Sequence, residues 1–185
     1  MLDSIIAERY AKSLFELALE TGKFEEVRKD MDLMLDVCQN SRDFRQMLIS
    51  PVIRPDKKIA LMDAVFSGKI EGLSKEFYRL LSRKRREKYL EGIAKEFIVK
   101  YKKYHNIHVI EIRSAAPLSK EIREKVVNII ENRTNGKVEL IEIIDTKLIG
   151  GFIVSDEGRR YDASLTTTIK KLKKEFEENL YIREL

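Results

Sequence analysis

The sequence predicts a mainly α-helical protein with a small α/β part: an N-terminal six-helix antiparallel bundle followed by a small C-terminal α/β domain. Two observations support this fold class. Apolar residues recur at helical spacing through the first 105 residues, with short breaks between the runs. After His105 the pattern changes to short runs rich in β-branched residues, which are typical of strands. We therefore expect a boundary near Tyr104–Ile107 and two domains, residues 1–105 and 106–185.

Helices separated by short breaks account for the first domain. The first helix is predicted from Asp3 to Thr21 and ends near Gly22, a residue type that commonly ends helices. The other five are predicted at residues 24–38, 43–49, 56–66, 70–82 and 90–101. Because the connections between these amphipathic segments are short, neighbouring helices are expected to pack antiparallel.

The second domain reads as strand, helix, strand, hairpin and helix. Strands are predicted at Ile107–Ala115 and Lys137–Ile144, and Pro117 and Ser119 introduce the helix between them. In the segment 148–172, LIGGFIVSDEGRRYDASLTTTIKKL, a Gly-Gly pair leads into an apolar strand. Asp156-Glu157-Gly158 then predicts a tight turn before the return strand.

A final helix follows the hairpin, and Asp162 or Ser164 can cap its N-terminus. Its apolar residues share one side and are expected to pack on the sheet; they are Leu165, Ile169, Leu172, Phe176 and Leu180. Lys170, Lys171, Lys173 and Lys174 lie elsewhere on this helix. They are either a solvated face or a contact for acidic residues of a partner.

Two segments near the ends of the chain resemble one protein family. The segment 148–172 is similar to the C-terminal signature of the delta subunit of F-type ATP synthase, called the oligomycin-sensitivity-conferring protein in mitochondria. Residues 8–17, ERYAKSLFEL, resemble the first helix of that family, although Ser13 stands where alanine is more usual. The resemblance implies a non-catalytic peripheral-stalk connector that holds the catalytic hexamer against rotation by linking the alpha subunits to the b subunits.

The first helix has an apolar arc of about half its circumference at about 100° per residue. One shoulder carries Ile6, Tyr10 and Leu17, and the other carries Ala7, Ala11, Phe15 and Ala18. From these angles alone, either one shoulder is available to a partner or the helix is buried between two neighbours.

The resemblance implies a groove between the first and fifth helices that binds the N-terminal amphipathic helix of an alpha subunit. Carried onto this chain, the partner-binding residues are Ile6, Tyr10, Ser13, Leu17, Phe77, Leu80 and Leu81. Apolar anchors of this kind suit helix-in-groove binding. The second domain resembles the part that meets the peripheral-stalk b subunits. Its 14 basic and 14 acidic residues balance, so we expect mainly apolar contact there.

The net charge of +5 resides in the first domain, which has 22 Lys/Arg and 17 Asp/Glu. The run Arg83-Lys84-Arg85-Arg86 suggests an alternative function, a basic nucleic-acid-binding adaptor that contacts phosphates. Three acidic residues follow this run and no aromatic residues interleave with it. A solvated helix junction, or a docking patch for an acidic protein, is therefore the preferred interpretation, with no nucleic acid as partner.

The sequence contains no pattern typical of catalysis, and an unrelated small enzyme is the least favoured hypothesis. Cys38 is the sole cysteine and lies at helical spacing with apolar neighbours, so we expect a buried thiol. His105 and His108 lack further ligands for a metal, and no phosphate-binding or dinucleotide motif occurs. We expect no catalytic, cofactor-binding or metal-binding residues and no cofactor.

No apolar run approaches the ~18 residues of a membrane-spanning helix, and no signal peptide precedes the first helix. The resemblance then implies a peripheral protein at the cytoplasmic face of the bacterial plasma membrane. It would associate with the membrane only indirectly, as part of the ATP synthase complex.

Overall fold

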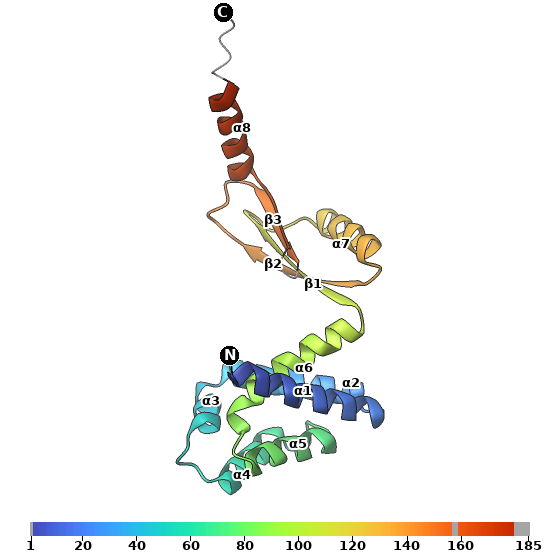
Figure 1. Cartoon of the computed structure of the whole chain (residues 1–185), viewed down its shortest axis with the longest axis vertical. Helices are drawn as coiled ribbons and strands as arrows, with labels where there is room; N and C mark the ends of the chain where they lie inside the picture. Colours follow the sequence, from blue (N-terminus) through green and yellow to red (C-terminus); the bar gives the residue numbers. More distant parts are fainter. Residues whose placement is uncertain (1, 157–158, 180–185) are drawn as a thin grey trace, which may run out of the picture. The chain divides into compact units, whose positions relative to one another are not determined.

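The computed structural model describes residues 2–156 and 159–179. The protein is mostly helical with a small four-stranded sheet, which confirms the predicted mainly α class with a small α/β part. It divides into two compact units, Met1–Tyr104 and His105–Leu185. Figure 1 shows helices α1–α6 in the first unit, and the sheet with α7 and α8 in the second.

The first unit consists of helices joined by short connections. They are α1 (Leu2–Glu20), α2 (Phe24–Asn40), α3 (Arg42–Ile49), α4 (Pro55–Phe66), α5 (Gly72–Arg83), the 3-10 turn η1 (Glu87–Tyr89) and α6 (Leu90–Tyr104). Local signals position the helix ends. The Ser41 hydroxyl accepts a hydrogen bond from the Phe44 amide at the start of α3, as expected of an N-cap. The short η1 turn was not predicted.

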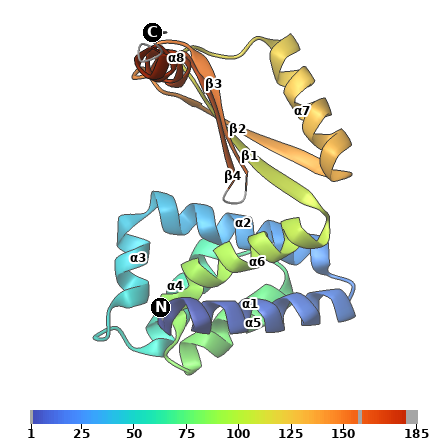
Figure 2. The same ribbon diagram turned by 45° about the horizontal axis from the view of Figure 1, so that its top comes forward.

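The core of the first unit lies where α1 and α2 pack against α6, and Figure 2 shows these three helices side by side. Small residues allow the close approach of α1 and α6, since a Cβ at Gly92 would lie 3.2 Å from the Cβ of Ala7. The core also contains Cys38, as predicted. Burial raises the pKa of its thiol to about 12, so the reactive thiolate is scarce at neutral pH.

The second unit is built on a sheet of strand order β2-β1-β3-β4. Its elements are β1 (Ile107–Ser114), α7 (Lys120–Thr134), β2 (Lys137–Ile144), β3 (Gly151–Asp156), β4 (Arg159–Ser164) and α8 (Leu165–Asn179). Strands β1 and β2 are parallel and are joined through α7, whereas β1–β3 and β3–β4 are antiparallel. The turn residues Glu157 and Gly158 lie outside the described residues.

One face of the sheet is only partly covered by α7. The register pairs Ile112 with Val154, and Val154 with Tyr161, so these three residues share a face because side chains alternate along each strand. Helix α7 packs against β2, at the edge of the sheet opposite β4. The part of this face that belongs to β3 and β4 therefore lies beside the helix and not beneath it.

Helix α8 does not bury its apolar side against the sheet, so this expectation was wrong. Leu165, Ile169 and Leu172 are each about half exposed, and Phe176 is 70% exposed; Leu180 lies outside the described residues. The reason is the connection, because α8 begins directly after β4 and continues beyond the end of that strand (Figure 1). Ser164 caps the helix, since its hydroxyl accepts a hydrogen bond from the Thr167 amide.

Candidate partner-binding surfaces

Helices α1 and α5 meet through an aromatic contact. The rings of Tyr10 and Phe77 lie edge to face with their centroids 6.3 Å apart, an arrangement that aromatic pairs favour. Beyond the C-terminus of α1, Lys23 Nζ lies 3.2 Å from a carboxylate oxygen of Glu71, just before α5. These two contacts place α1 and α5 antiparallel.

The residues predicted for partner binding differ in exposure. We define the α1–α5 face as the six that reach or approach the surface: Ile6, Tyr10, Ser13, Leu17, Phe77 and Leu80. Leu17 and Leu80 are each 42% exposed, while Phe77 is 8% exposed. Leu81 is fully buried in the core, so it supports the face from below and is not positioned to touch a partner.

The structure distinguishes the two shoulders of the first helix. Ala7, Ala11 and Ala18 are buried, and Leu14 is buried with them. Ile6 and Tyr10 are half-buried, and Leu17 is exposed. The alanine-rich shoulder therefore faces the core, and the shoulder of Ile6, Tyr10 and Leu17 lies at the surface.

The basic run after α5 does not form a single patch. Arg83 is the last residue of α5, and Arg85 adopts a left-handed backbone conformation with φ of 55°. Arg86 then donates its backbone N–H to the Leu81 carbonyl. This turn brings the Arg86 side chain to α1, where Nη1 donates a 2.8 Å hydrogen bond to Tyr10 Oη.

Arg86 was not predicted to belong to the α1–α5 face. Its guanidinium carbon also lies 5.6 Å from the centroid of the Tyr10 ring, within the range of a cation–π interaction. The sequence shows a basic run at this point, but it does not indicate which of its residues turns back toward α1. The left-handed conformation of Arg85 directs Arg86 to α1. Glycine or asparagine is the usual residue in that conformation, so an arginine gives no sequence signal for the turn.

Two polar clusters in the first unit are structural. Lys58 forms a buried ion pair with Glu87. Asp63 on α4 accepts hydrogen bonds from Arg79 and Tyr78 on α5. The Arg79 hydrogen bond, followed by that of Tyr78, holds the pKa of Asp63 below its ordinary value. These contacts join separate segments of the unit and satisfy most of the groups, as is usual inside a protein, although Glu87 Oε2 and Arg79 Nε have no hydrogen-bond partner among the described residues.

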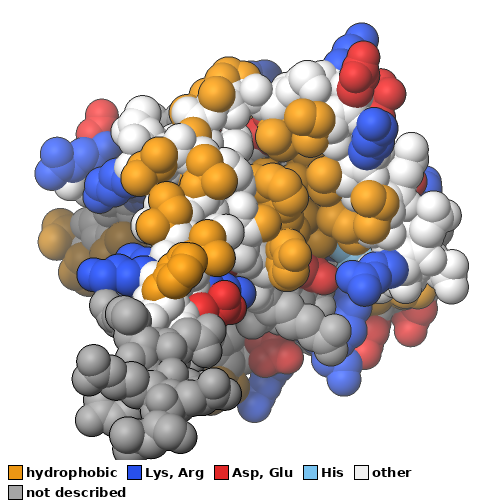
Figure 3. Space-filling view, turned by 90° about the horizontal axis from the view of Figure 1, so that it is seen from above, with side chains coloured by type: hydrophobic (Ala, Val, Ile, Leu, Met, Phe, Trp, Pro, Cys, Tyr) orange, Lys and Arg blue, Asp and Glu red, His pale blue; other side chains and the backbone are white. Residues whose placement is uncertain are grey.

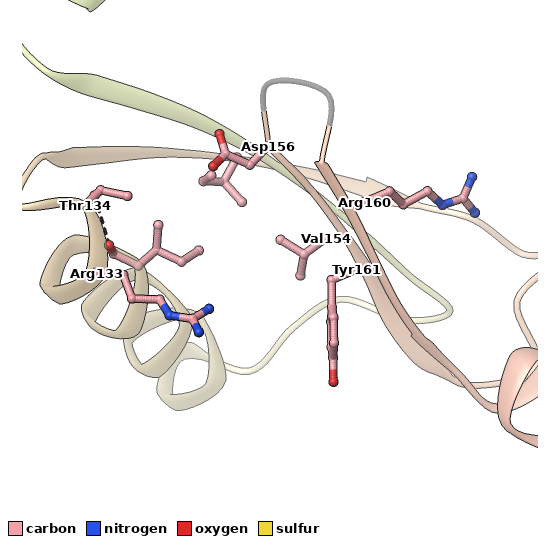
Figure 4. Close-up of a pocket in the computed structure, with 8 residues that line it drawn as sticks. Arg133, Thr134, Val154, Asp156, Arg160 and Tyr161 are labelled. Atoms are coloured by element: carbon pink, nitrogen blue, oxygen red, sulfur yellow. Dashed lines mark hydrogen bonds between the residues drawn. The ribbon is translucent and has the colours of Figure 1, made fainter.

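The second unit carries a separate apolar surface. Figure 3 shows apolar side chains gathered in clusters on the side of the molecule seen from above. The exposed apolar residues of the second unit include Ile169, Leu172 and Phe176 on α8 and Ile129 on α7. A hollow of about 630 Å³ lies between α7 and the sheet, with Ile130, Val154 and Tyr161 in its lining. Figure 4 shows Val154 and Tyr161 from the strands, and Arg133 and Thr134 from α7, around it. Exposed apolar side chains gathered in this way typically mark an interaction site.

A cluster of metal ligands and a membrane-spanning helix are both absent from the described residues. No group of three potential metal ligands of the His, Cys, Asp or Glu type occurs within residues 2–156 and 159–179. Among the described helices, none combines the length and the apolar character needed to cross a membrane.

Comparison with known proteins identifies relatives along nearly the whole chain. Residues 6–176 match the family described as ATP synthase delta (OSCP) subunit. The ATP synthase subunit delta of Cytophaga hutchinsonii is 32% identical over 180 residues, which cover 97% of this chain and 98% of that protein. The subunit delta of Phocaeicola vulgatus is 33% identical over 177 residues, or 95% and 96% of the two chains.

A solved structure has the same fold. A chain in the cryo-EM structure of the Toxoplasma gondii mitochondrial ATP synthase hexamer superposes with a TM-score of 0.71, covering 92% of this chain and 96% of that chain. The two sequences are 22% identical.

Proposed function

Because this chain belongs to the ATP synthase delta (OSCP) subunit family, we propose that it is a peripheral-stalk connector linking the alpha subunits of the catalytic hexamer to the b subunits. Subunits of this family are structural components of ATP synthase and are not themselves catalytic. A connector needs durable protein contacts on two surfaces. The two compact units each carry one candidate surface, and this separation is the observation that best supports the proposal.

The first unit, whose helices α1–α6 we take to act as one antiparallel bundle, binds the N-terminal amphipathic helix of an alpha subunit. The α1–α5 face supports this assignment because its exposed leucines flank an aromatic pair. Helix-in-groove recognition uses apolar anchors at helical spacing. Leu17 and Leu80 serve as such anchors. Each is already more than half buried, so covering its remaining 42% contributes only part of the about 1.5–3 kcal/mol gained by fully burying an exposed side chain.

The second unit binds the C-terminal end of the b subunits. Exposure of the apolar side of α8 supports this, since isolating Phe176 and Ile169 from water in a partner would recover the hydrophobic free energy that the fold leaves unused. The lysines of α8 contribute less on this view. At about 100° per residue, Lys170, Lys171 and Lys174 point away from the apolar side.

The mechanical role follows from these contacts. Rotation of the central part of the enzyme exerts torque on the hexamer, and synthesis requires that the hexamer be restrained. The protein would act at the cytoplasmic face of the bacterial plasma membrane, held there through the complex.

Reconstitution tests this function. ATP synthase from the same organism is depleted of this chain and assayed with and without its addition. We expect ATP hydrolysis by the hexamer to persist without the chain, while proton-driven ATP synthesis is lost and returns on addition. Synthesis at the full rate without the chain would exclude a connector role.

A further inference from the structure

The guanidinium of Arg86 is held at the end of the α1–α5 face by a neutral partner. Its Nη1 donates to Tyr10 Oη at 2.8 Å, which uses one of the five N–H donors of a guanidinium. Within the described part of the chain, no ion pair of Arg86 with a carboxylate is formed. The side chain is thus oriented, yet its charge is not neutralised locally.

The charge along the α1–α5 face is unequal at its two ends. The end at Tyr10 carries the exposed side chain of Arg86, which the turn at Arg85 brings to α1. At the other end Lys23 is paired with Glu71 and Glu16 with Lys12, and the exposed Glu20 is the last residue of α1. An elongated ligand therefore meets the charge of Arg86 at one end of the face, and ion pairs with the carboxylate of Glu20 at the other.

We propose that Arg86 binds a carboxylate of the helix that docks on the α1–α5 face, and that this contact sets the direction in which the helix lies. This inference rests on the proposed function, because it concerns the same bound helix. Apolar contacts alone hold an amphipathic helix with little preference for direction. A guanidinium fork pairs with a carboxylate through two parallel hydrogen bonds, which adds orientation as well as affinity.

The orientation of Arg86 before binding favours this contact. Its hydrogen bond to Tyr10 and the turn at Arg85 restrict the side chain, so less conformational entropy is lost when a carboxylate is bound. Tyr10 takes part twice, because its ring forms part of the apolar surface while its hydroxyl orients the cation.

The test uses the full chain and a synthetic peptide of about 20 residues from the N-terminus of the alpha subunit of the same organism, a length close to that of α1. Dissociation constants are measured by titration calorimetry for the wild type, Arg86→Glu, Arg86→Lys and Arg83→Glu. Arg83 is the matched control, since it belongs to the same run and its replacement changes the charge equally. We expect Arg86→Glu to weaken binding about tenfold or more, Arg86→Lys to weaken it less, and Arg83→Glu to have a small effect.

Peptides in which each Asp or Glu is replaced in turn by Lys then identify the paired carboxylate. One of them should bind Arg86→Glu more tightly than the unmodified peptide does. A spin label is then attached to the peptide next to the Asp or Glu that pairs with Arg86. It should broaden the NMR signals of residues near Tyr10 and not those of residues near Lys23. Equal losses for Arg83→Glu and Arg86→Glu without rescue, or a label nearer Lys23, would overturn this inference. Failure of the unmodified peptide to bind the wild type would instead count against the proposed alpha-subunit contact.

Discussion

Lys58 Nζ lies 2.5 Å from Glu87 Oε1 in the interior of the first unit, and it also donates a 2.8 Å hydrogen bond to the Leu48 carbonyl. Both side chains are less than 10% exposed. The pair joins the first turn of α4 to the end of α3 and to the η1 turn. It therefore links three segments that are separated in the chain by loops and, between α4 and η1, by helix α5.

Replacing one member of this pair should destabilise the first unit strongly. Lys58→Met leaves the Glu87 carboxylate buried without its counter-charge, at a cost of about 3–5 kcal/mol. The double variant Lys58→Met/Glu87→Leu should recover most of that loss, because no uncompensated charge is then buried. Urea unfolding of the wild type and the two variants measures the difference. A double variant as unstable as the single one would show that the pair is needed for more than charge balance.

Acid should weaken the link between α4 and α5 through Asp63. Hydrogen bonds from Arg79 and then Tyr78 lower its pKa below the ordinary 3.8. The resulting stabilisation is fully present above pH 3.8 and is lost as the pH falls through the lower folded-state pKa. Asp63→Asn should therefore be less stable at neutral pH and should show a shallower loss of stability below about pH 4. Thermal melts at a series of pH values measure the melting temperature of the wild type and of Asp63→Asn. Parallel plots of melting temperature against pH for the two proteins would show that Asp63 contributes nothing.

The positions of most helices and strands could be predicted from the sequence, because their apolar periodicity is strong and their ends carry clear signals. Strand β2 occupies Lys137–Ile144 as predicted, and α4 ends at Phe66 before Ser67-Gly68. Helix α5 begins two residues later than expected, because Glu71 has an extended backbone and its N–H is bound by Asp30 from α2. A contact between residues distant in the chain decides that boundary, and periodicity does not report it.

The functional surfaces could be predicted only in part. Helical angles identified the shoulder of Ile6, Tyr10 and Leu17, but its exposure depends on which neighbours cover α1. The side of α8 was assigned wrongly, since an apolar stripe looks the same whether it packs on its own sheet or is left for a partner. Arg86 joins the face through a backbone turn that no residue type in the run announces.

The Gly-Gly pair should tolerate change at one position and not at the other. A Cβ at Gly151 would lie 2.3 Å from the Ala163 carbonyl oxygen, and its φ of +77° is strained for any residue with a side chain. A Cβ at Gly150 would meet only the end of the flexible Leu165 side chain, at 2.7 Å. Gly151→Ala should therefore disrupt the β3–β4 pairing, and Gly150→Ala should have a much smaller effect. Amide hydrogen exchange in β3 and β4 measures the effect of each substitution. Exchange should be faster in Gly151→Ala than in Gly150→Ala, and equal rates in the two variants would contradict the prediction.

Charge placed on the α1–α5 face should weaken binding of the alpha-subunit peptide without unfolding the protein. Leu80→Asp is the better test than Tyr10→Asp, because a carboxylate at position 10 would lie beside Arg86 and pair with it. Leu80 is 42% exposed, so the fold should tolerate the change, while the complex would bury the new charge. We expect a loss of about tenfold or more in affinity by titration calorimetry.

Leu19→Asp is the control for this prediction. Leu19 is similarly exposed, at 37%, but it lies about 200° around α1 from Leu17. Its replacement should leave peptide affinity nearly unchanged. Similar losses of peptide affinity in Leu19→Asp and Leu80→Asp would show that the peptide does not bind specifically at the α1–α5 face.

Stalk binding should depend on the apolar side of α8 more than on its lysines. Ile169→Glu places a carboxylate in the middle of the exposed apolar stripe, between Leu165 and Leu172, and should weaken binding of the C-terminal segment of the b subunits about tenfold or more. Because Ile169 is already 56% exposed, the stability of the second unit should change little. Replacing Lys170, Lys171, Lys173 and Lys174 by Gln should weaken binding only modestly and flatten its salt dependence, as is typical of charges at the rim of an interface. Both variants are compared with the wild type and with a chain that ends at residue 105, which should retain no stalk binding. If the shortened chain bound the b segment with undiminished affinity, the stalk contact would lie in the first unit. If replacing the lysines weakened binding more than Ile169→Glu does, the contact would lie on the opposite side of α8.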